Sequence, residues 1–233
     1  MATLYLVRHG QASFGAADYD QLSALGVQQA QALGQYWQNR WPEYWQEQQL
    51  GFAQIWRGSL KRHQQTLAGI CPQANAQVTS RLNEYDSEAI IHAVLTKQAQ
   101  ELPPLGTPAG YKAHFQVLRT GLQAWIEGQL APEGMPSFAQ FRAGIAEVLD
   151  EIRSTHGAEN QARILVVSSG GPIATAVMHL LGAPASSMID LNYQIRNTAI
   201  TTLQVSKHKL SLSGFNHLPH LDTPDKAAWI TST

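Results

Sequence analysis

A buried-strand pattern that ends in a cation and an imidazole is the first feature of the chain that could carry chemistry. The run from Leu4 to Val7 is typical of a buried strand, and Arg8 and His9 follow it directly. A polar strand end is the simple alternative, although strands more often end in turn residues. Among arginines, like charge keeps the imidazole of His9 neutral and nucleophilic. Attack on a bound phosphoryl group would give a phosphohistidine and divide one displacement into two easier ones.

Two further segments carry groups that suit a phosphoryl substrate. Arg62 lies in SLKRHQQT, and guanidinium groups of Arg8 and Arg62 facing one point would bind a tetrahedral oxyanion. The alternative for Arg62 alone is a solvated helix residue. The segment SSGGP offers Ser169 and Gly170 as phosphate-binding residues, and Pro172 suits the first position of a helix. Free amides at such a helix start bind anions.

A carboxylic acid would have to protonate the leaving oxygen of a phosphate ester. The candidate is Glu84 in RLNEYDSE, with Asp86 and Glu88 behind it. A partly apolar or anionic setting that raises the pKa of the carboxyl group would suit this role. An ordinary surface carboxylate is the alternative.

The elements that must position these residues follow an α/β pattern. Short apolar runs with helical periodicity between them imply a mainly parallel sheet with helices on both faces, in three layers. The expected strands are Thr3–Val7, Phe52–Trp56, Ile164–Val167 and Ala199–Val205. In such sheets ligands bind at the carboxyl ends of the strands. Arginine, histidine, serine and the glycine-rich turn should therefore meet at one edge.

The chain is predicted to form a single domain over residues 1–233. Its 233 residues, 44% of them hydrophobic, suffice for one substantial core. From about residue 86 to 135 the sequence has two helical segments, EAIIHAVLTKQAQEL and YKAHFQVLRTGLQAWIEGQL, and no strand signal. We interpret this part as a helical insertion or cap that shapes the substrate site.

Composition restricts the partners. Sixteen Lys and Arg against seventeen Asp and Glu give a net charge of −1, so no global field attracts nucleic acid or an anionic membrane. The uncharged run from Ile164 to Ala183 contains Ser-Ser-Gly-Gly-Pro, which favours a strand, a turn and a helix over a membrane span. With one cysteine, Cys71, and no signal-peptide pattern, the expected location is the cytoplasm.

The segment LVRHGQAS resembles the signature of the histidine phosphatase superfamily, also called the phosphoglycerate mutase-like family. The similarity continues in LSALGVQQAQALG, SLKRHQQT, RLNE, ILVVSSGG and NTAITTL, and so spans most of the chain outside the insertion. The resemblance implies that His9 is the phosphorylated nucleophile, that Arg8 and Arg62 bind phosphoryl oxygens, and that Glu84 is the proton donor. It also implies a phosphoglycerate mutase-like fold, no metal or other cofactor, and a phosphorylated small molecule or phosphoprotein as partner.

Three positions depart from the family pattern. Ser169 stands where the family usually has a histidine after the strand, Gly15 where many sugar-phosphate enzymes have an asparagine, and Gly58 where a serine is common. A thinner anion site favours phosphatase activity over phosphoglycerate mutase activity. The loss of the histidine also motivates an alternative, a pseudoenzyme that binds a phosphorylated ligand without turnover.

Three other sets of residues have competing interpretations. Ser169 as a nucleophile would need Gly-x-Ser-x-Gly, and Val167 stands in place of the first glycine. His63, next to Arg62, points about 100° away from it on a helix, so we do not expect it to replace the missing histidine. His217 and His220 have a spacing seen in metal sites, but a structural role is favoured because no further ligand is near in sequence. The sequence names neither the substrate nor the oligomeric state.

Overall fold

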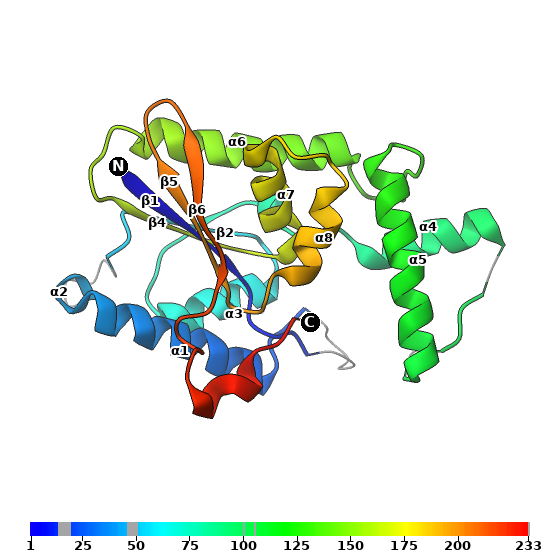
Figure 1. Ribbon diagram of the computed structural model, residues 1–233, viewed down its shortest axis with the longest axis horizontal. Coiled ribbons are helices and arrows are strands. Elements are labelled where there is room, and N and C mark those ends of the chain that lie inside the picture. The colour runs from blue at the N-terminus through cyan, green and yellow to red at the C-terminus, as the bar shows by residue number, and fades with distance from the viewer. Residues whose placement is uncertain (14–19, 46–50, 100, 105, 233) are drawn as a thin grey trace.

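One mixed sheet forms the centre of the computed structural model, which describes residues 1–13, 20–45, 51–99, 101–104 and 106–232 (Figure 1). In the described part of the chain the strand order is β3-β2-β4-β1-β5-β6. The strands are β1 (Ala2–Arg8), β2 (Gln54–Arg57), β3 (Gln77–Val78), β4 (Arg163–Ser168), β5 (Ile200–Val205) and β6 (Leu210–His217). The pairs from β3 to β1 are parallel, and β5 is antiparallel to both of its neighbours. The expected mainly parallel sheet is confirmed, and β3 and β6 add to the four predicted strands.

Two hydrophobic clusters sandwich the sheet, because alternate residues of a strand point to opposite faces. Leu4 and Leu6 of β1 belong to a cluster that includes residues of α6 (Phe138–His156) and α7 (Gly170–Leu181). Val7 belongs to a second cluster with residues of α1 (Ala24–Arg40) and α3 (Lys61–Ile70). Helices therefore cover both faces, as Figure 1 shows, and the three-layer α/β class is confirmed.

The remaining helices connect or flank these layers. They are α2 (Pro42–Trp45), α4 (Ser87–Gln98), α5 (Pro108–Ile126), α8 (Ser187–Gln194) and the 3₁₀ turns η1 (Ser80–Leu82) and η2 (Pro224–Trp229). Helices α4 and α5 pack against each other and extend beside the sheet in Figure 1. They coincide with the two helical segments expected between residues 86 and 135. The indole of Trp125 in α5 contacts the rings of Tyr85 and Phe138, and so joins this pair to the core.

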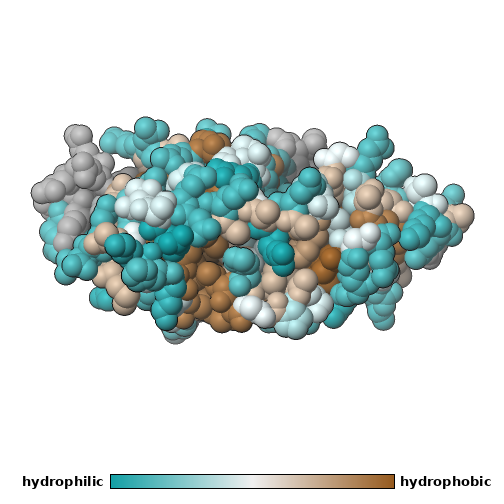
Figure 2. Space-filling model, turned by 90° about the horizontal axis from the view of Figure 1, so that it is seen from above, coloured by the Kyte–Doolittle hydropathy of each residue, from teal (hydrophilic) through white to brown (hydrophobic). Residues whose placement is uncertain are grey.

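The uncharged run from Ile164 to Ala183 is divided between β4 and α7, with Ser169 between them. None of the helices among the described residues combines the length and the hydrophobicity that a membrane crossing requires. Figure 2 shows a surface on which hydrophilic residues predominate, with hydrophobic ones gathered in patches near the middle. Cys71 is buried, and its burial raises the pKa of the thiol to about 12.

Candidate active site

The carboxyl ends of β1, β2 and β4 meet at one edge of the sheet because the three strands are parallel. The register places Arg8 beside Ser168 and Arg57 beside Val167. The polar groups that follow these strands are therefore neighbours. We call the following residues the strand-end cluster: Arg8, His9, Arg62, His63, Glu84, Ser169, Gly170 and Gly171.

His9 is held by the backbone in an orientation that defines its tautomer. Its Nδ1 lies 2.7 Å from the carbonyl oxygen of Gly10, and a carbonyl only accepts, so Nδ1 carries the proton and Nε2 carries a lone pair. The side chain is buried. Burial, and then the charges of Arg8 and Arg62, hold the pKa of His9 well below its usual value. The imidazole is therefore neutral, with a free nucleophilic nitrogen.

The two arginines of the cluster are each fixed by other groups. Nη1 of Arg62 donates to Oδ1 of Asp20 at 2.9 Å, and the guanidinium is mostly buried. Nη1 of Arg8 donates to the carbonyl oxygens of Ile195 and Ser232. Both cations act on the pKa of His9 and of Glu84, which places them near both side chains. This arrangement suits an anion between the arginines.

The carboxyl group of Glu84, which precedes α4 in the chain, contacts the start of α7. Both carboxylate oxygens are 3.1 Å from the backbone nitrogen of Gly171, and a Cβ at residue 171 would overlap Oε1. Desolvation raises the pKa of this carboxyl group, although the hydrogen bond from Gly171 and the charges of Arg62 and Arg8 oppose the shift. Glycine is thus needed at residue 171 for the close approach, and the acid is biased toward its protonated form.

The two carboxylates expected behind Glu84 lie elsewhere. Asp86 is the N-cap of α4, where Oδ1 accepts from the amide of Ala89 at 2.9 Å, and Glu88 is exposed in the first turn of that helix. Both therefore contribute to the helix start. Neither belongs to the strand-end cluster.

The helix start itself differs from expectation. We expected Pro172 at the first helical position, but α7 begins at Gly170, with Ser169 as the N-cap residue and Pro172 as the third residue. Proline is tolerated there because the backbone amides of the first turn have no carbonyl acceptor within the helix, so the missing N–H costs no hydrogen bond. The amide of Gly171 is occupied by Glu84, so the helix start holds the protein's own carboxylate.

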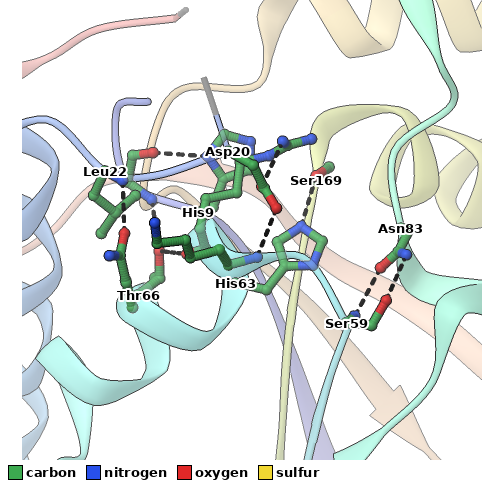
Figure 3. A network of polar contacts seen from close by, with 12 residues as sticks. His9, Asp20, Leu22, Ser59, His63, Thr66, Asn83 and Ser169 are labelled. Atoms are coloured by element: carbon green, nitrogen blue, oxygen red, sulfur yellow. Dashed lines mark hydrogen bonds and ion pairs between the residues drawn. The ribbon is translucent and has the colours of Figure 1, made fainter. Parts of the chain in front are cut away.

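Ser169 does not sit in a strained turn of the kind that presents a serine nucleophile. Its backbone is extended, with φ −114° and ψ 173°, and its side chain makes no capping bond to α7. Its Oγ instead lies 2.7 Å from Nε2 of His63 (Figure 3). A serine hydrolase elbow has no support from this geometry.

His63 differs most from the sequence expectation. Its fully buried ring points into the cluster, with its centroid 5.8 Å from that of His9. Burial, and then the charges of Arg62 and Arg57, lower the pKa of His63 to about 3, so the ring is neutral. Sequence reasoning missed this residue. The available signal was the presence of two small residues, Gly58 and Ser169, where the family has larger ones.

The other two histidines that the sequence singled out have different surroundings. His217 ends β6, whereas His220 is buried with Nε2 2.9 Å from Oγ1 of Thr198. Among the described residues, no three His, Cys, Asp or Glu side chains are grouped as metal ligands. Gly15 lies outside the described residues.

Comparison with known proteins identifies relatives of this chain. The sequence pattern of the histidine phosphatase superfamily, branch 1, matches residues 4–105 and 111–217. No curated protein matches the chain in sequence.

Solved structures share the fold. A mutant phosphoserine phosphatase from Entamoeba histolytica, in complex with phosphoserine, is 22% identical with a TM-score of 0.65, and the match covers 95% of this chain and 100% of that one. The α-ribazole phosphatase of Shigella flexneri is 18% identical with a TM-score of 0.61, over 92% and 96%. A mycobacterial glucosyl-3-phosphoglycerate phosphatase is 20% identical with a TM-score of 0.60, over 92% and 98%.

Proposed function

Because this chain belongs to the histidine phosphatase superfamily, we propose that it hydrolyses a phosphomonoester through a phosphohistidine formed on His9. The observation that carries the proposal is the hydrogen bond from Nδ1 of His9 to the carbonyl of Gly10. This bond leaves the lone pair on Nε2 in a buried place between two arginines. A neutral, oriented imidazole next to fixed cations is suited to attack on a phosphoryl group.

In the first step, Nε2 of His9 forms a bond to phosphorus and the ester P–O bond breaks. Arg8 and Arg62 bind the phosphoryl oxygens. The positive imidazolium that forms keeps its proton on Nδ1, which continues to donate to the carbonyl oxygen of Gly10. The leaving oxygen takes the proton of Glu84, whose raised pKa favours the acid form. The products of this step are an alcohol, phospho-His9 and the Glu84 carboxylate.

In the second step, water attacks phosphorus while the Glu84 carboxylate accepts its proton. The P–N bond breaks, inorganic phosphate leaves, and His9 returns to the neutral Nδ1–H form. Glu84 thus ends the cycle protonated, as it began. The same carboxyl group acts as acid and then as base, so the cycle needs no other titrating side chain.

The names of the structural relatives support a small phosphorylated molecule as the substrate. They are a phosphoserine phosphatase, an α-ribazole phosphatase and a glucosyl-3-phosphoglycerate phosphatase. All three names describe removal of phosphate from an organic compound. The buried thiol of Cys71 is consistent with a reducing cytoplasm as the location.

The test is phosphate release from p-nitrophenyl phosphate by the wild type, by His9→Ala and by a control, His208→Ala. His208 is an exposed residue in the turn between β5 and β6, at the opposite edge of the sheet. We expect His9→Ala to abolish release and His208→Ala to leave it unchanged. Quenched wild-type enzyme should carry phosphate in an acid-labile, base-stable bond. Release that persists in His9→Ala would refute the mechanism.

A second candidate, binding without turnover, is motivated by the serine at residue 169. It predicts saturable binding of inorganic phosphate by the wild type with no phosphate released from the ester on prolonged incubation. Both measurements on one preparation therefore separate an enzyme from a binding protein.

A further inference from the structure

An imidazole from α3 occupies space next to the serine that stands in place of the family's histidine. On the basis of the function proposed above, we propose that His63 takes the place of that histidine and acts through Ser169 as a positioning residue for the phosphoryl group. The observation is the contact of 2.7 Å between Nε2 of His63 and Oγ of Ser169. The imidazole would thus enter the site from the helix after β2 rather than from the residue after β4.

Two small residues make room for the ring of His63. A Cβ on Gly58 would overlap Nδ1 of His63 and would also lie 2.7 Å from Oδ1 of Asn83. Figure 3 shows the ring between Ser169 on one side and Asn83 on the other. At residue 169, a serine is short enough to leave the imidazole in place. A serine at residue 58 and a histidine at residue 169, the family's usual pair, would each compete with this ring for space.

Hydrogen bonding between the two side chains defines what the pair can offer. Among the residues that the structure describes, Nε2 of His63 is the hydrogen-bond partner of the Ser169 hydroxyl. Nδ1 of His63 makes no hydrogen bond of normal geometry, although the backbone of Gly58 lies near enough to oppose the fall in the pKa of the ring. A phosphoryl oxygen only accepts, so Ser169 must donate its hydroxyl proton to it and accept from Nε2–H of His63. Nδ1 then carries no proton and needs no acceptor. The bound phosphate therefore selects one tautomer and one hydroxyl direction.

This arrangement differs electrostatically from a histidine that contacts phosphate directly. His63 is fully buried and stays neutral, because burial and then the charges of Arg62 and Arg57 lower its pKa. The phosphoryl group accordingly meets a neutral donor at this point, and positive charge comes from the arginines. A neutral neighbour also leaves His9 with one cation fewer beside its nucleophilic nitrogen.

The experiment moves the imidazole back to residue 169. Four proteins are compared with the wild type: His63→Ala, Ser169→His, the double variant His63→Ala/Ser169→His, and the double variant His63→Ala/Ser169→Phe. The readouts are the dissociation constant for inorganic phosphate, measured calorimetrically, and kcat and KM for p-nitrophenyl phosphate. The phenylalanine variant is the matched control, because it fills a similar, slightly larger volume with a ring that has no nitrogen.

We expect each single variant to weaken phosphate binding about tenfold, the order expected when one hydrogen bond to a charged group is lost. His63→Ala removes the imidazole, and Ser169→His forces two rings into one space. The double variant with histidine should recover affinity to within about threefold of the wild type. The phenylalanine control should recover thermal stability but not affinity. A role in packing alone predicts equal recovery by both double variants and is excluded by a difference between them.

His63→Gln adds a rescue test, because the glutamine amide can still donate to Ser169. We expect it to retain more phosphate affinity than His63→Leu. Equal loss in both would overturn the inference, as would failure of the histidine double variant to recover.

The outcomes separate this inference from the proposed function. If the wild type turns over substrate through His9 but the exchange does not recover, only the role of His63 fails. If the wild type binds phosphate without turnover and the exchange restores binding, the proposed hydrolysis fails and the role of His63 stands. If the wild type binds no phosphate, both fail.

Discussion

The buried histidines of this protein show how local partners set the chemistry of one side chain. In His156, Nδ1 contacts Glu159 and Nε2 contacts Gln54, so both nitrogens are occupied and the residue has a structural role. His9 has its Nδ1 committed to a carbonyl, which leaves the other nitrogen for a substrate. Between His156 and His9, the partners rather than burial itself separate the structural imidazole from the proposed nucleophile.

Glu84→Gln should affect substrates according to their leaving groups. The amide keeps the shape of the side chain but cannot donate a proton to an alkoxide in the same way. We expect a loss of about 10²-fold or more in kcat on an alkyl phosphate and a much smaller loss on p-nitrophenyl phosphate, whose phenolate leaves without protonation. The measurement is the ratio of the two kcat values in wild type and variant.

The pH profile gives an independent readout of the same residue. Desolvation raises the pKa of Glu84 and burial lowers the pKa of His9, so the acid form of Glu84 and the neutral form of His9 coexist on the acidic side. Hydrolysis of the alkyl phosphate should therefore fall as pH rises through the raised pKa, and Glu84→Gln should remove this fall. An unchanged profile in the variant would show that another group donates the proton.

The sequence was most informative for residues that follow strands. Arg8, His9 and Ser169 could be placed together because parallel strands end at one edge of a sheet. His63 could not, because its direction relative to Arg62 on one helix does not reveal the space that residues 58 and 169 leave for its ring. A contact between side chains more than a hundred residues apart depends on packing that no local pattern contains.

At the scale of elements, the strands that were predicted have a clear local pattern in the sequence, and those that were missed do not. β1 and β4 are buried on both faces and have the apolar runs that this requires. β3 has two exposed residues, and β6 is an edge strand that mixes apolar residues with serine and asparagine. Short or edge strands are stabilised by pairing with a neighbour, which a single sequence does not display.

Gly58→Ala tests the turn between β2 and α3. The added methyl group would overlap the ring of His63, and overpacking of this kind costs about 1–3 kcal/mol. The cost should be smaller in a His63→Ala background, where the ring is absent and only Asn83 remains near. Denaturant unfolding of the two single variants and the double variant measures the difference. Additive effects would show that residue 58 does not restrain His63.

Ser137→Ala tests an element remote from the cluster. Ser137 and Gln140 form a capping box at the start of α6, with bonds of 2.9 Å and 3.3 Å between side chain and backbone. Loss of the cap should lower the free energy of unfolding by about 1 kcal/mol. Because neither residue contacts the strand-end cluster, kcat and KM should not change. A change in kcat would show that α6 is coupled to the site.

At the scale of the whole molecule, the end of the described chain returns to the first strand. The guanidinium of Arg8 donates to the carbonyl oxygen of Ser232, and the backbone N–H of Asn197 donates to the carbonyl oxygen of Thr231 at 2.8 Å. Nε2 of Gln29 in α1 donates to the carbonyl of Trp229. The last segment thus fixes both an arginine of the strand-end cluster and helix α1. The site therefore includes contacts between the two ends of the described chain.

Acid should unfold this protein partly through buried neutral histidines. Burial lowers the pKa of His63 and of His220 to about 3 each, whereas an exposed histidine in the unfolded chain titrates near 6.5. Between these values the unfolded chain binds more protons than the folded one. The free energy of unfolding therefore rises with pH in this range. The contribution of the two histidines to it is fully present above about pH 6.5 and is lost as pH falls toward 3.

His220→Gln isolates one of these groups without touching the strand-end cluster. The amide can still reach Oγ1 of Thr198, the partner of His220, but it does not titrate. Each proton taken up on unfolding contributes a slope of about 1.4 kcal/mol per pH unit, so the variant should show a slope smaller by about that amount between pH 4 and 6. Urea unfolding at intervals across this range measures both slopes. Equal slopes would mean that His220 is protonated in the folded protein, which its burial beside Lys226 opposes.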